Sequence, residues 1–457
     1  MAAPTERRHV ALLPVPLASH PAMMLLLGRK IISSVPNVEV SLLVTDPSAT
    51  SLSAAAADSG IRVVRVDSGV DKAVAVTPPQ ALRKFAEVAV ESLRKGLAVA
   101  EEEVGFKITC IVADAMMTFV CRVLAEERGV KWAALWSPSA GALAAHMHTE
   151  HFLNAIGPHG IEGHKEETAD QYIPEFPSIP IIDLPPEIFN VGSPFGKMLH
   201  LMSLYLDNAV AVVVNSYDAL EPAATDILRR VFSDKLPVLN AGPFTLTMPS
   251  SSETSGADPH NCLPWLDSHA AAPTSFVYIS FGSEYSPPLE ELVSLAEALE
   301  ATKVPFLWSL PNRFKPSLPE GFTERTSTLG KVVPWAPQMS VLSHVAVGAQ
   351  LTHCGWNSVL ESIVTGVPII GRPSRIADHP FDGRLVFDVW GIGVEVEGWK
   401  LTKATAMAAL EKVMRGEEGK KAREKIQVMK RLSNEATTEP NGSSAKNLRE
   451  FINIITC

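Results

Sequence analysis

Long apolar runs, basic charge and cysteine are all scarce in this chain of 457 residues. The longest apolar runs, such as Ala22–Leu27, have about six residues, far fewer than the roughly 18 needed to cross a bilayer. We therefore expect no membrane span, and the charged first residues lack the long apolar stretch of a secretory signal. Forty basic against 50 acidic residues give a net charge of −10, which argues against a general nucleic-acid binder.

The five cysteines are too few and too scattered to build a disulfide framework. They are Cys110, Cys121, Cys262, Cys354 and Cys457. A sparse, odd-numbered set is typical of a reducing compartment, so we predict a cytoplasmic protein.

Three familiar cofactor motifs are also missing. The first strand-like run is followed by Val15–Pro21 instead of a G-x-G-x-x-G turn, and the chain has neither a G-x-x-x-x-G-K-[ST] loop nor a D-x-D pair. Nicotinamide, flavin and P-loop ATP chemistry therefore lose their support. We expect no cofactor and no metal.

What the chain does contain is an alternation of short apolar runs and amphipathic stretches. Strand-like runs, rich in Val, Ile and Leu, lie at Val10–Pro14, Val38–Thr45, Ile61–Val66, Thr109–Ala113, Lys131–Trp136, Ala209–Asn215, Phe276–Ser280, Val304–Leu310, Lys331–Val333, Ala349–Thr352 and Val367–Ile370. Helical patterns lie between them at Ala81–Ala98, Phe119–Arg128 and Pro288–Ala301, the last with Leu289, Leu292, Val293, Ala296 and Leu299 on one face. The pattern predicts an α/β fold with a mostly parallel sheet in each half.

Two segments lack this periodicity. Met248–Pro264 is rich in Ser, Pro and Gly and is predicted to be a linker, and Ala155–Pro186 is predicted to be a long loop. The domains expected are residues 1–245 and 265–440, joined by a linker at 246–264, with a helical tail at 441–457 whose Leu448, Phe451 and Ile452 lie on one side. Ligands of such folds bind at the carboxyl ends of the strands.

The 45 residues from Trp335 to His379 hold the densest cluster of chemical side chains. A strand-like run ends at Thr352 and a helical pattern begins near Ser358, so the glycine between them opens a helix N-terminus that can bind an anion. His353 adds a donor there, and Glu361 could accept both hydroxyls of a ribose. Trp335 follows another strand and could stack on a flat base. These residues would bind the base, the ribose and the phosphate in the order in which a nucleotide presents them.

This segment resembles the signature of the plant family-1 UDP-sugar glycosyltransferases. The matching motifs are WAPQ at 335–338, HCGWNS at 353–358, ES at 361–362 and GVP at 366–368. PTSFVYISFGS, VPFLWSLP, LPEGF and KVVPWAPQ are most similar to the flavonoid 3-O-glycosyltransferases. The resemblance implies the GT-B fold, in which two Rossmann-like domains face each other across a cleft, the first binding the acceptor and the second the UDP-sugar. It also implies a C-terminal helix that returns to the first domain.

The resemblance assigns the remaining site residues. Residues implied to bind UDP are Ser283, Trp335, Ala336, Gln338, His353, Trp356, Asn357, Ser358 and Glu361. Ser137, Asp378 and His379 are implied to contact the sugar, and Gln80, Met116 and His146 the acceptor. The resemblance implies that neither the sugar nor the acceptor is bound through a metal ion.

His20 is the expected general base, on the loop that follows the first strand. A histidine of near-neutral pKa can take a proton from a phenolic hydroxyl. Asp114, at the end of another strand, would accept the other ring N–H and stabilise the imidazolium. The implied reaction is a single displacement that inverts the configuration at the anomeric carbon, with UDP as the leaving group.

A departure from the family signature bears on the sugar. The family usually ends this motif with Asp-Gln, whereas here Pro373 is followed by Ser374–Ala377 and then Asp378-His379, one residue longer. An imidazole places its donor or acceptor at a different height from a carboxamide. His often accompanies sugars with an axial 4-hydroxyl, so UDP-galactose is expected before UDP-glucose, with UDP-arabinose also open.

Several alternatives stay open at this point. His146, His148 and His151 invite a metal interpretation, but their spacing does not bring them to one helical face. The acceptor could be another plant phenolic or a terpenoid, glycosylated at oxygen or carbon, instead of the 3-hydroxyl of a flavonol or anthocyanidin. A non-catalytic nucleotide-sugar binding protein is the remote alternative. We expect a monomer whose partners are the UDP-sugar and a flavonoid.

Overall fold

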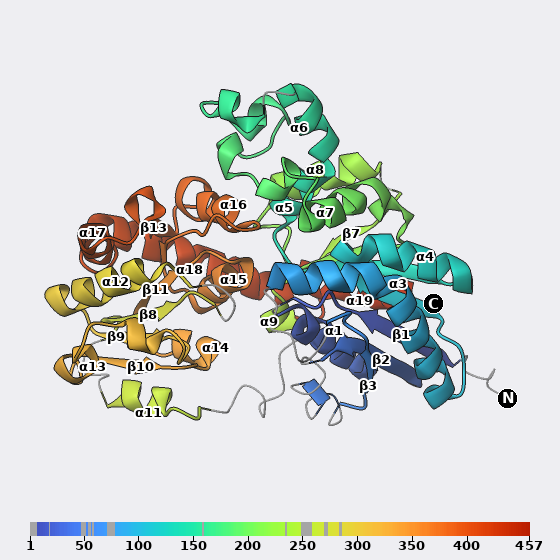
Figure 1. Ribbon diagram of the computed structural model, residues 1–457, viewed down its shortest axis with the longest axis horizontal. Helices are drawn as coiled ribbons and strands as arrows, with labels where there is room; N and C mark the ends of the chain where they lie inside the picture. Colours follow the sequence, from blue (N-terminus) through green and yellow to red (C-terminus); the bar gives the residue numbers. More distant parts are fainter. Residues whose placement is uncertain are drawn as a thin grey trace. The chain divides into compact units, whose positions relative to one another are not determined.

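The computed structural model describes residues 7–17, 19–46, 52–53, 56, 59–70, 78–157, 160–233, 235–247, 258–268, 273–282 and 286–457. The chain divides into two compact units: unit 1 comprises Met1–Ile182, Pro186–Pro249 and Glu435–Cys457, and unit 2 comprises Asp183–Pro185 and Ser250–Asn434. Each unit is built around one parallel β-sheet covered by helices (Figure 1). The predicted α/β class is therefore confirmed.

The sheet of unit 1 has seven described parallel strands in the order β3-β2-β1-β4-β5-β6-β7. Their bounds are β1 Arg8–Leu13, β2 Val38–Thr45, β3 Arg62–Val66, β4 Cys110–Asp114, β5 Lys131–Trp136, β6 Val212–Val214 and β7 Val238–Asn240. The central strands are buried on both faces, as their unbroken Val, Ile and Leu runs predict. β7 was not predicted, because three residues carry too little pattern.

Helices surround this sheet and fill the connections between its strands. They are α1 His20–Ser34, α3 Pro78–Val104, α4 Thr118–Arg128, α5 Ala140–Met147, α6 Thr149–Ile156, α7 Pro194–Tyr205, α8 Pro222–Phe232, α9 Phe244–Thr247 and α19 Ser443–Thr456. The segment predicted as a long loop at 155–186 holds short 3-10 turns, among them η3 Ile161–His164, η4 Ala169–Gln171 and η5 Ile181–Asp183.

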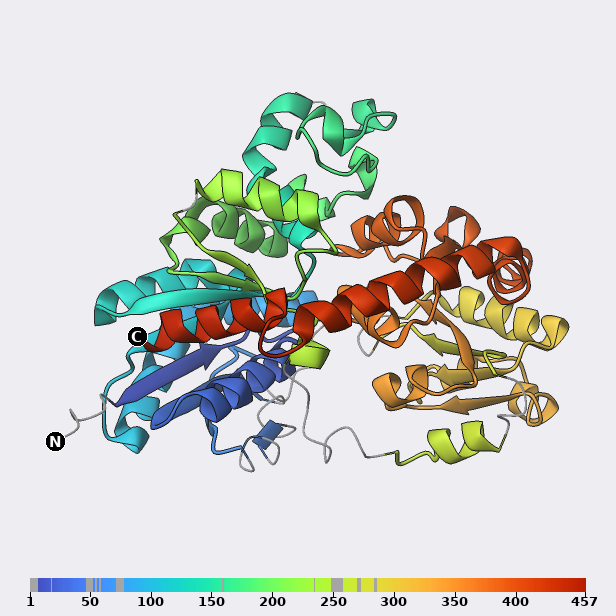
Figure 2. The same ribbon diagram turned by 180° about the vertical axis from the view of Figure 1, so that it is seen from behind.

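The last helix of the chain, α19, is part of the core of unit 1. Leu448, Phe451, Ile452 and Ile455 are almost fully buried and belong to the same apolar cluster as residues of β1, β2 and α1. Figure 2 shows α19 lying along the strands of this unit. Lys131 at the start of β5 donates hydrogen bonds to the backbone oxygens of Ile454 and Cys457, which ties the end of the chain to the sheet.

The sheet of unit 2 has six described parallel strands in the order β10-β9-β8-β11-β12-β13. Their bounds are β8 Phe276–Ser280, β9 Phe306–Ser309, β10 Gly330–Val333, β11 Val347–Thr352, β12 Ile369–Gly371 and β13 Gly393–Glu395. The helices are α11 Cys262–Asp267, α12 Leu289–Thr302, α13 Phe322–Arg325, α14 Gln338–Leu342, α15 Trp356–Thr365, α16 His379–Arg384, α17 Lys403–Met414 and α18 Glu417–Thr437.

The apolar face of α12 differs from its prediction at one end. Leu292, Ala296 and Leu299 are fully buried, but Leu289 is 52% exposed. Leu289 is the first helical residue, and a helical side chain leans toward the N-terminus, so this leucine points past the end of the covered surface. The predicted apolar face of α12 is therefore covered from Leu292 onward and not at Leu289.

Both sheets reverse their strand order once. The reversal lies between β1 and β4 in unit 1 and between β8 and β11 in unit 2. Connections leaving two such strands run to opposite sides of the sheet, and the crevice that opens at their carboxyl ends is where α/β proteins bind ligands. Among the described residues, no helix is long and apolar enough to cross a membrane.

Candidate active site

The reversal in unit 1 brings two of the predicted catalytic side chains together. β1 ends at Leu13 and leads to His20, while β4 ends at Asp114. His20 is the first residue of α1 and not a loop residue as predicted. The helix begins there because Pro21, whose fixed φ suits the first turn, follows at once.

The contact between these two side chains is short and well supported. Nδ1 of His20 lies 2.5 Å from Oδ2 of Asp114, and the two side chains are 14% and 2% exposed. The other carboxylate oxygen, Oδ1, accepts the backbone N–H of Met116 at 3.0 Å. Because Asp114 is fixed from both sides, it holds the imidazole of His20 in one orientation and directs Nε2 away from the pair.

Other predicted residues of unit 1 lie around this pair or apart from it. Ser137, predicted to contact the sugar, is buried after β5, and its Oγ lies 3.3 Å from Nδ1 of His20. Met116 is buried in a 3-10 turn directly after Asp114. His146 on α5 is buried edge-on against Trp136, and burial lowers the pKa of His146 to about 3. Gln80 is exposed on α3.

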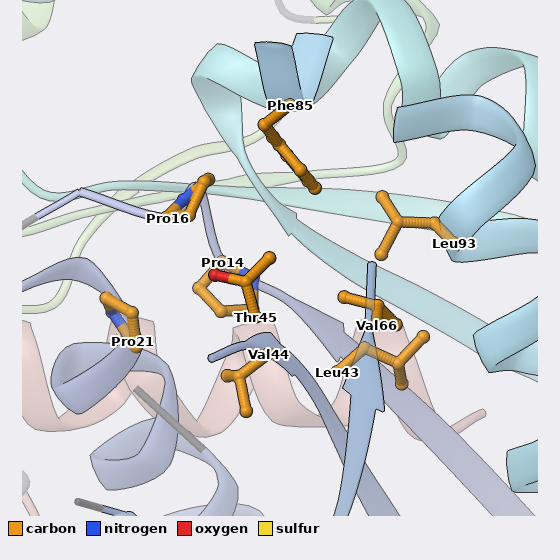
Figure 3. Close-up of a pocket in the computed structure, with 9 residues that line it drawn as sticks. All are labelled: Pro14, Pro16, Pro21, Leu43, Val44, Thr45, Val66, Phe85 and Leu93. Atoms are coloured by element: carbon orange, nitrogen blue, oxygen red, sulfur yellow. The ribbon is translucent and has the colours of Figure 1, made fainter. Parts of the chain in front are cut away.

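An apolar hollow lies at the carboxyl ends of β1, β2 and β3 (Figure 3). Its lining comprises Pro14, Pro16, Pro21, Leu43, Val44, Thr45, Val66, Phe85 and Leu93. Its side chains leave no room for a water molecule. The ring of Phe85 and the methyl groups of Leu93, two residues of α3, line one side of it. This hollow is a gap in the packing and not a preformed ligand cavity.

The reversal in unit 2 places His353 directly after β11. His353 is almost fully buried, and burial together with the neighbouring His379 holds the pKa of its imidazole well below the usual range. Two glycines make the space for this ring. A Cβ on Gly355 would lie 2.6 Å from Nε2 of His353, and one on Gly282 would lie 3.1 Å from its Cε1.

The helix α15 begins immediately after this histidine. Gly355 is its N-cap and supplies no side-chain hydrogen bond to the first turn. The backbone N–H groups of that turn, with the positive end of the helix dipole, form an arrangement that suits a phosphate. Cys354 before the cap has a φ of 63°, an uncommon conformation for a non-glycine residue that turns the chain from the strand into the helix.

A chain of polar contacts links the predicted nucleoside residues. The Tyr278 hydroxyl donates to Oε1 of Gln338 at 3.1 Å, and Nε2 of Gln338 donates to Ser358 Oγ at 3.0 Å and to Glu361 Oε2 at 2.5 Å. Burial raises the pKa of Glu361 to about 7, although the bond from Gln338 opposes this. Sequence reasoning missed Tyr278, because its strand pattern marks it only as a core residue.

The two tryptophans of the signature have different environments. Trp335 is 48% exposed, which leaves its indole face available for stacking, while its neighbour Ala336 is buried. Trp356 is buried, with its ring 6.2 Å from that of Trp390. The indole of Trp356 therefore packs in the interior, and a contact of this residue with UDP stays a prediction. Asn357 is half-buried in the first turn of α15, and Ser283 lies outside the described residues.

The segment with the extra residue leads into α16. Asp378 is the N-cap of this helix and His379 its first residue. The rings of His379 and His353 meet edge to face with centroids 4.6 Å apart. Burial lowers the pKa of His379, and Asp378 opposes this shift. His379 therefore lies against His353, and the contact of Asp378 and His379 with the sugar stays a prediction.

Metal-binding geometry is not found among the described residues: no group of three or more His, Cys, Asp or Glu side chains is placed to hold an ion. His148 and His151, which sequence analysis weighed with His146, make separate contacts, His148 to the backbone oxygen of Ala144 and His151 to that of Tyr172.

Comparison with known proteins identifies the family. The model of the family described as "UDP-glucoronosyl and UDP-glucosyl transferase" matches residues 201–441. An anthocyanidin 3-O-galactosyltransferase of Rhododendron delavayi is 41% identical over 99% of this chain and 98% of its own length. The chain belongs to the UDP-glycosyltransferase family. This UDP-glycosyltransferase is also 40% identical to a flavonol 3-O-glucosyltransferase of Actinidia chinensis var. chinensis, over 98% of this chain and 97% of that relative.

The solved structures agree with the predicted fold. The crystal structure of a UDP-glucose: anthocyanidin 3-O-glucosyltransferase in complex with UDP superposes with a TM-score of 0.87 and 33% identity, covering 98% of this chain and 99% of that one. The fold assigned from sequence, GT-B, is confirmed by this match. The enzyme is a hexosyltransferase whose donor is a UDP-sugar, and enzymes of this family use no metal cofactor.

Proposed function

We propose that this UDP-glycosyltransferase transfers galactose from UDP-galactose to the 3-hydroxyl of a flavonol or anthocyanidin. The observation that carries the proposed chemistry is the short contact between His20 and Asp114. The 3-hydroxyl of a flavonoid is the acceptor in the names of the Rhododendron and Actinidia relatives, and one of these is a galactosyltransferase and the other a glucosyltransferase. The choice of galactose rests on His379.

The proton transfer follows from the arrangement of the pair. Nδ1 of His20 is held by Asp114, so Nε2 is the nitrogen that takes the proton of the acceptor hydroxyl. The acceptor oxygen forms its bond to the anomeric carbon while the bond from that carbon to the UDP oxygen breaks. Asp114 stabilises the imidazolium that results. Attack from the face opposite UDP converts an α-linked donor into a β-linked product.

The donor is proposed to bind to unit 2 and the acceptor to unit 1. Trp335 would stack on the uracil, and Glu361 would accept the ribose hydroxyls after Gln338 releases it. The diphosphate would lie at the N-terminus of α15, beside His353. His353 is neutral in this proposal, so it would stabilise the departing diphosphate by donating a hydrogen bond and not by positive charge.

A second candidate function is the same transfer with UDP-glucose. The Actinidia relative and the enzyme of known crystal structure are both named for glucose. Transfer to another phenolic or to a terpenoid, at oxygen or carbon, would use the same base. A cytoplasmic monomer also stays a proposal.

The purified enzyme should be assayed with quercetin and with cyanidin, each offered UDP-galactose, UDP-glucose and UDP-arabinose at equal concentration. Product mass and linkage are then read by mass spectrometry and NMR. A 3-O-galactoside formed fastest is the expected result. Equal or faster transfer from UDP-glucose would reject galactose preference, and products only with other phenolics would reject the flavonoid acceptor.

A further inference from the structure

The segment with the extra residue, Ser374–Ala377, provides a hydrogen bond directly to His379. Oγ of Ser374 lies 2.5 Å from Nδ1 of the His379 ring. Ser374 is 1% exposed, so this bond is shielded from water. The ring also contacts His353 edge to face. His379 is thus fixed at one nitrogen and on one side of its ring.

The backbone that carries Ser374 is itself anchored by the next residue. The guanidinium of Arg375 donates to Oδ1 of Asp183 at 2.9 Å and lies 4.5 Å from the ring centroid of Trp399. Arg384, from α16, donates to Oδ2 of the same aspartate at 2.8 Å and lies over the same tryptophan. One buried carboxylate and one aromatic ring therefore hold both the start of this segment, through Arg375, and the last residue of α16, Arg384.

The Ser374 bond also selects which ring nitrogen of His379 carries the proton. Among the described residues, the hydroxyl of Ser374 has no other hydrogen-bond acceptor. If Nδ1–H donated to this hydroxyl, the hydroxyl proton would stay unpaired in a buried place, which is costly. Donation by the hydroxyl to Nδ1 pairs both groups and puts the proton of the neutral ring on Nε2, where a sugar oxygen can accept it. His379 then presents an N–H donor on the side away from Ser374.

We propose that Ser374 is a positioning residue that fixes the orientation and tautomer of His379 and thereby sets the enzyme's discrimination between UDP-sugars with axial and equatorial 4-hydroxyls. The inference rests on the proposed function, because it takes His379 as the residue that meets the sugar. The fixed N–H donor reaches an oxygen at one height above the sugar ring. Without Ser374, the ring of His379 can rotate and exchange tautomers, so it would bind an axial and an equatorial 4-hydroxyl about equally well.

The test compares Ser374→Ala with Ser374→Thr, which keeps the hydroxyl. Ser41→Ala is a matched control, because Oγ of Ser41 makes a buried hydrogen bond to Nε2 of His9 at 2.8 Å within unit 1. Dissociation constants for UDP-galactose, UDP-glucose and UDP are measured by calorimetry, so that no assumption about the acceptor enters. Thermal melting of each variant reports the loss of stability separately.

The expected result is a change in the ratio of the UDP-galactose and UDP-glucose dissociation constants in Ser374→Ala. We expect the ratio to move toward one by about fivefold, the effect of one hydrogen bond that loses its geometry, while affinity for UDP stays the same. Ser374→Thr keeps the ratio at the wild-type value, because it keeps the hydroxyl. Ser41→Ala lowers the melting temperature but leaves the ratio unchanged.

A ratio that stays at the wild-type value in Ser374→Ala would overturn the proposal, as would an equal loss of affinity for all three ligands. If Ser374→Ala does not fold, Ser374→Cys, whose thiol is a weak donor, supplies the test: it must move the ratio when His379 is present and leave it unchanged in a His379→Gln background. Failure of the proposed function has a different signature. The wild-type enzyme would then bind UDP no better than uridine, or bind both UDP-sugars yet transfer to no phenolic.

Discussion

The two points of strand reversal use the same topology, and each has a histidine after one of its two central strands, but on opposite sides of the reversal and with opposite chemistry. In unit 1, His20 follows β1 and contacts a carboxylate at 2.5 Å. In unit 2, His353 follows β11, lies against two glycines and an imidazole, and has its pKa held well below the usual range. The first arrangement stabilises a protonated ring and the second prevents one.

The difference shows that the strand order provides a position and the neighbouring side chains provide the reactivity. Asp114 comes from β4, the strand beyond the reversal, so the fold itself brings an acid to His20. The strand beyond the other reversal, β8, leads instead to Gly282, which makes space and carries no charge. A base that must accept a proton and a donor that must stay neutral beside a diphosphate can thus share one architecture.

The largest expected effect on the comparison of the two histidines comes from removing the proposed base, His20. His20→Ala should lower kcat by about a thousandfold, since a positioned general base contributes 10²–10⁴-fold, while the KM for the UDP-sugar changes little. Asp114→Asn should lower kcat less, by about a hundredfold, because the ring keeps a neighbour but loses the charge. Steady-state kinetics with both substrates varied would measure both effects. A His20→Ala enzyme with near-normal kcat would remove His20 from the mechanism.

The second test fills the space that Gly355 leaves for the ring of His353. Gly355→Ala would place a methyl group 2.6 Å from Nε2 of His353, so the ring must move. We expect the KM for the UDP-sugar to rise about tenfold, because one hydrogen bond to the diphosphate and the first turn of α15 are both displaced. Gly163→Ala is the control, since a Cβ there meets nothing within 4 Å. Unchanged donor KM in Gly355→Ala would show that His353 does not contact the donor.

The smallest expected effect concerns pH. The pKa of Glu361 is raised to about 7 by burial, so this carboxyl is protonated below that pH and ionised above it. The ionised form accepts two ribose hydroxyls, so affinity for UDP-glucose should rise by about fivefold from pH 6 to pH 8. Calorimetry without an acceptor measures this directly. Glu361→Gln should bind more weakly and lose the pH dependence; a persistent pH dependence in that variant would assign it to another group.

Much of the fold follows from sequence because both sheets are buried on two faces. β2 and β5 have the bounds that their apolar runs predict, and β8 does too. The strands β7 and β13 were missed, since three residues at a sheet edge carry too little pattern. The sequence pattern does not predict the start of helix α1, because S-H-P is typical of a loop. The fold places most of the predicted site residues after strands, where the pattern expects them.

The contacts among site residues were less predictable. Gln338 and Glu361 belong to one motif, but nothing in the spacing reveals that Gln338 donates to this carboxylate in the unliganded enzyme. The bond between Ser374 and His379 depends on how a four-residue segment turns, with Ala377 at a φ of 51°. Such a turn is set by anchors that are distant in sequence, here Asp183 and Trp399. Residue types and spacing do not encode those distances.

The burial of α19 in the core of unit 1 has a consequence for biosynthesis. β1 precedes the main part of unit 2 in the chain, and Phe451, which packs in the same apolar cluster as residues of β1, follows it. The ribosome therefore releases the whole of unit 2 before the core of unit 1 can close. The sheet of unit 1 must therefore wait, with an open apolar face, until α19 has been made, and chaperones that cover exposed apolar surface can act on it during that time.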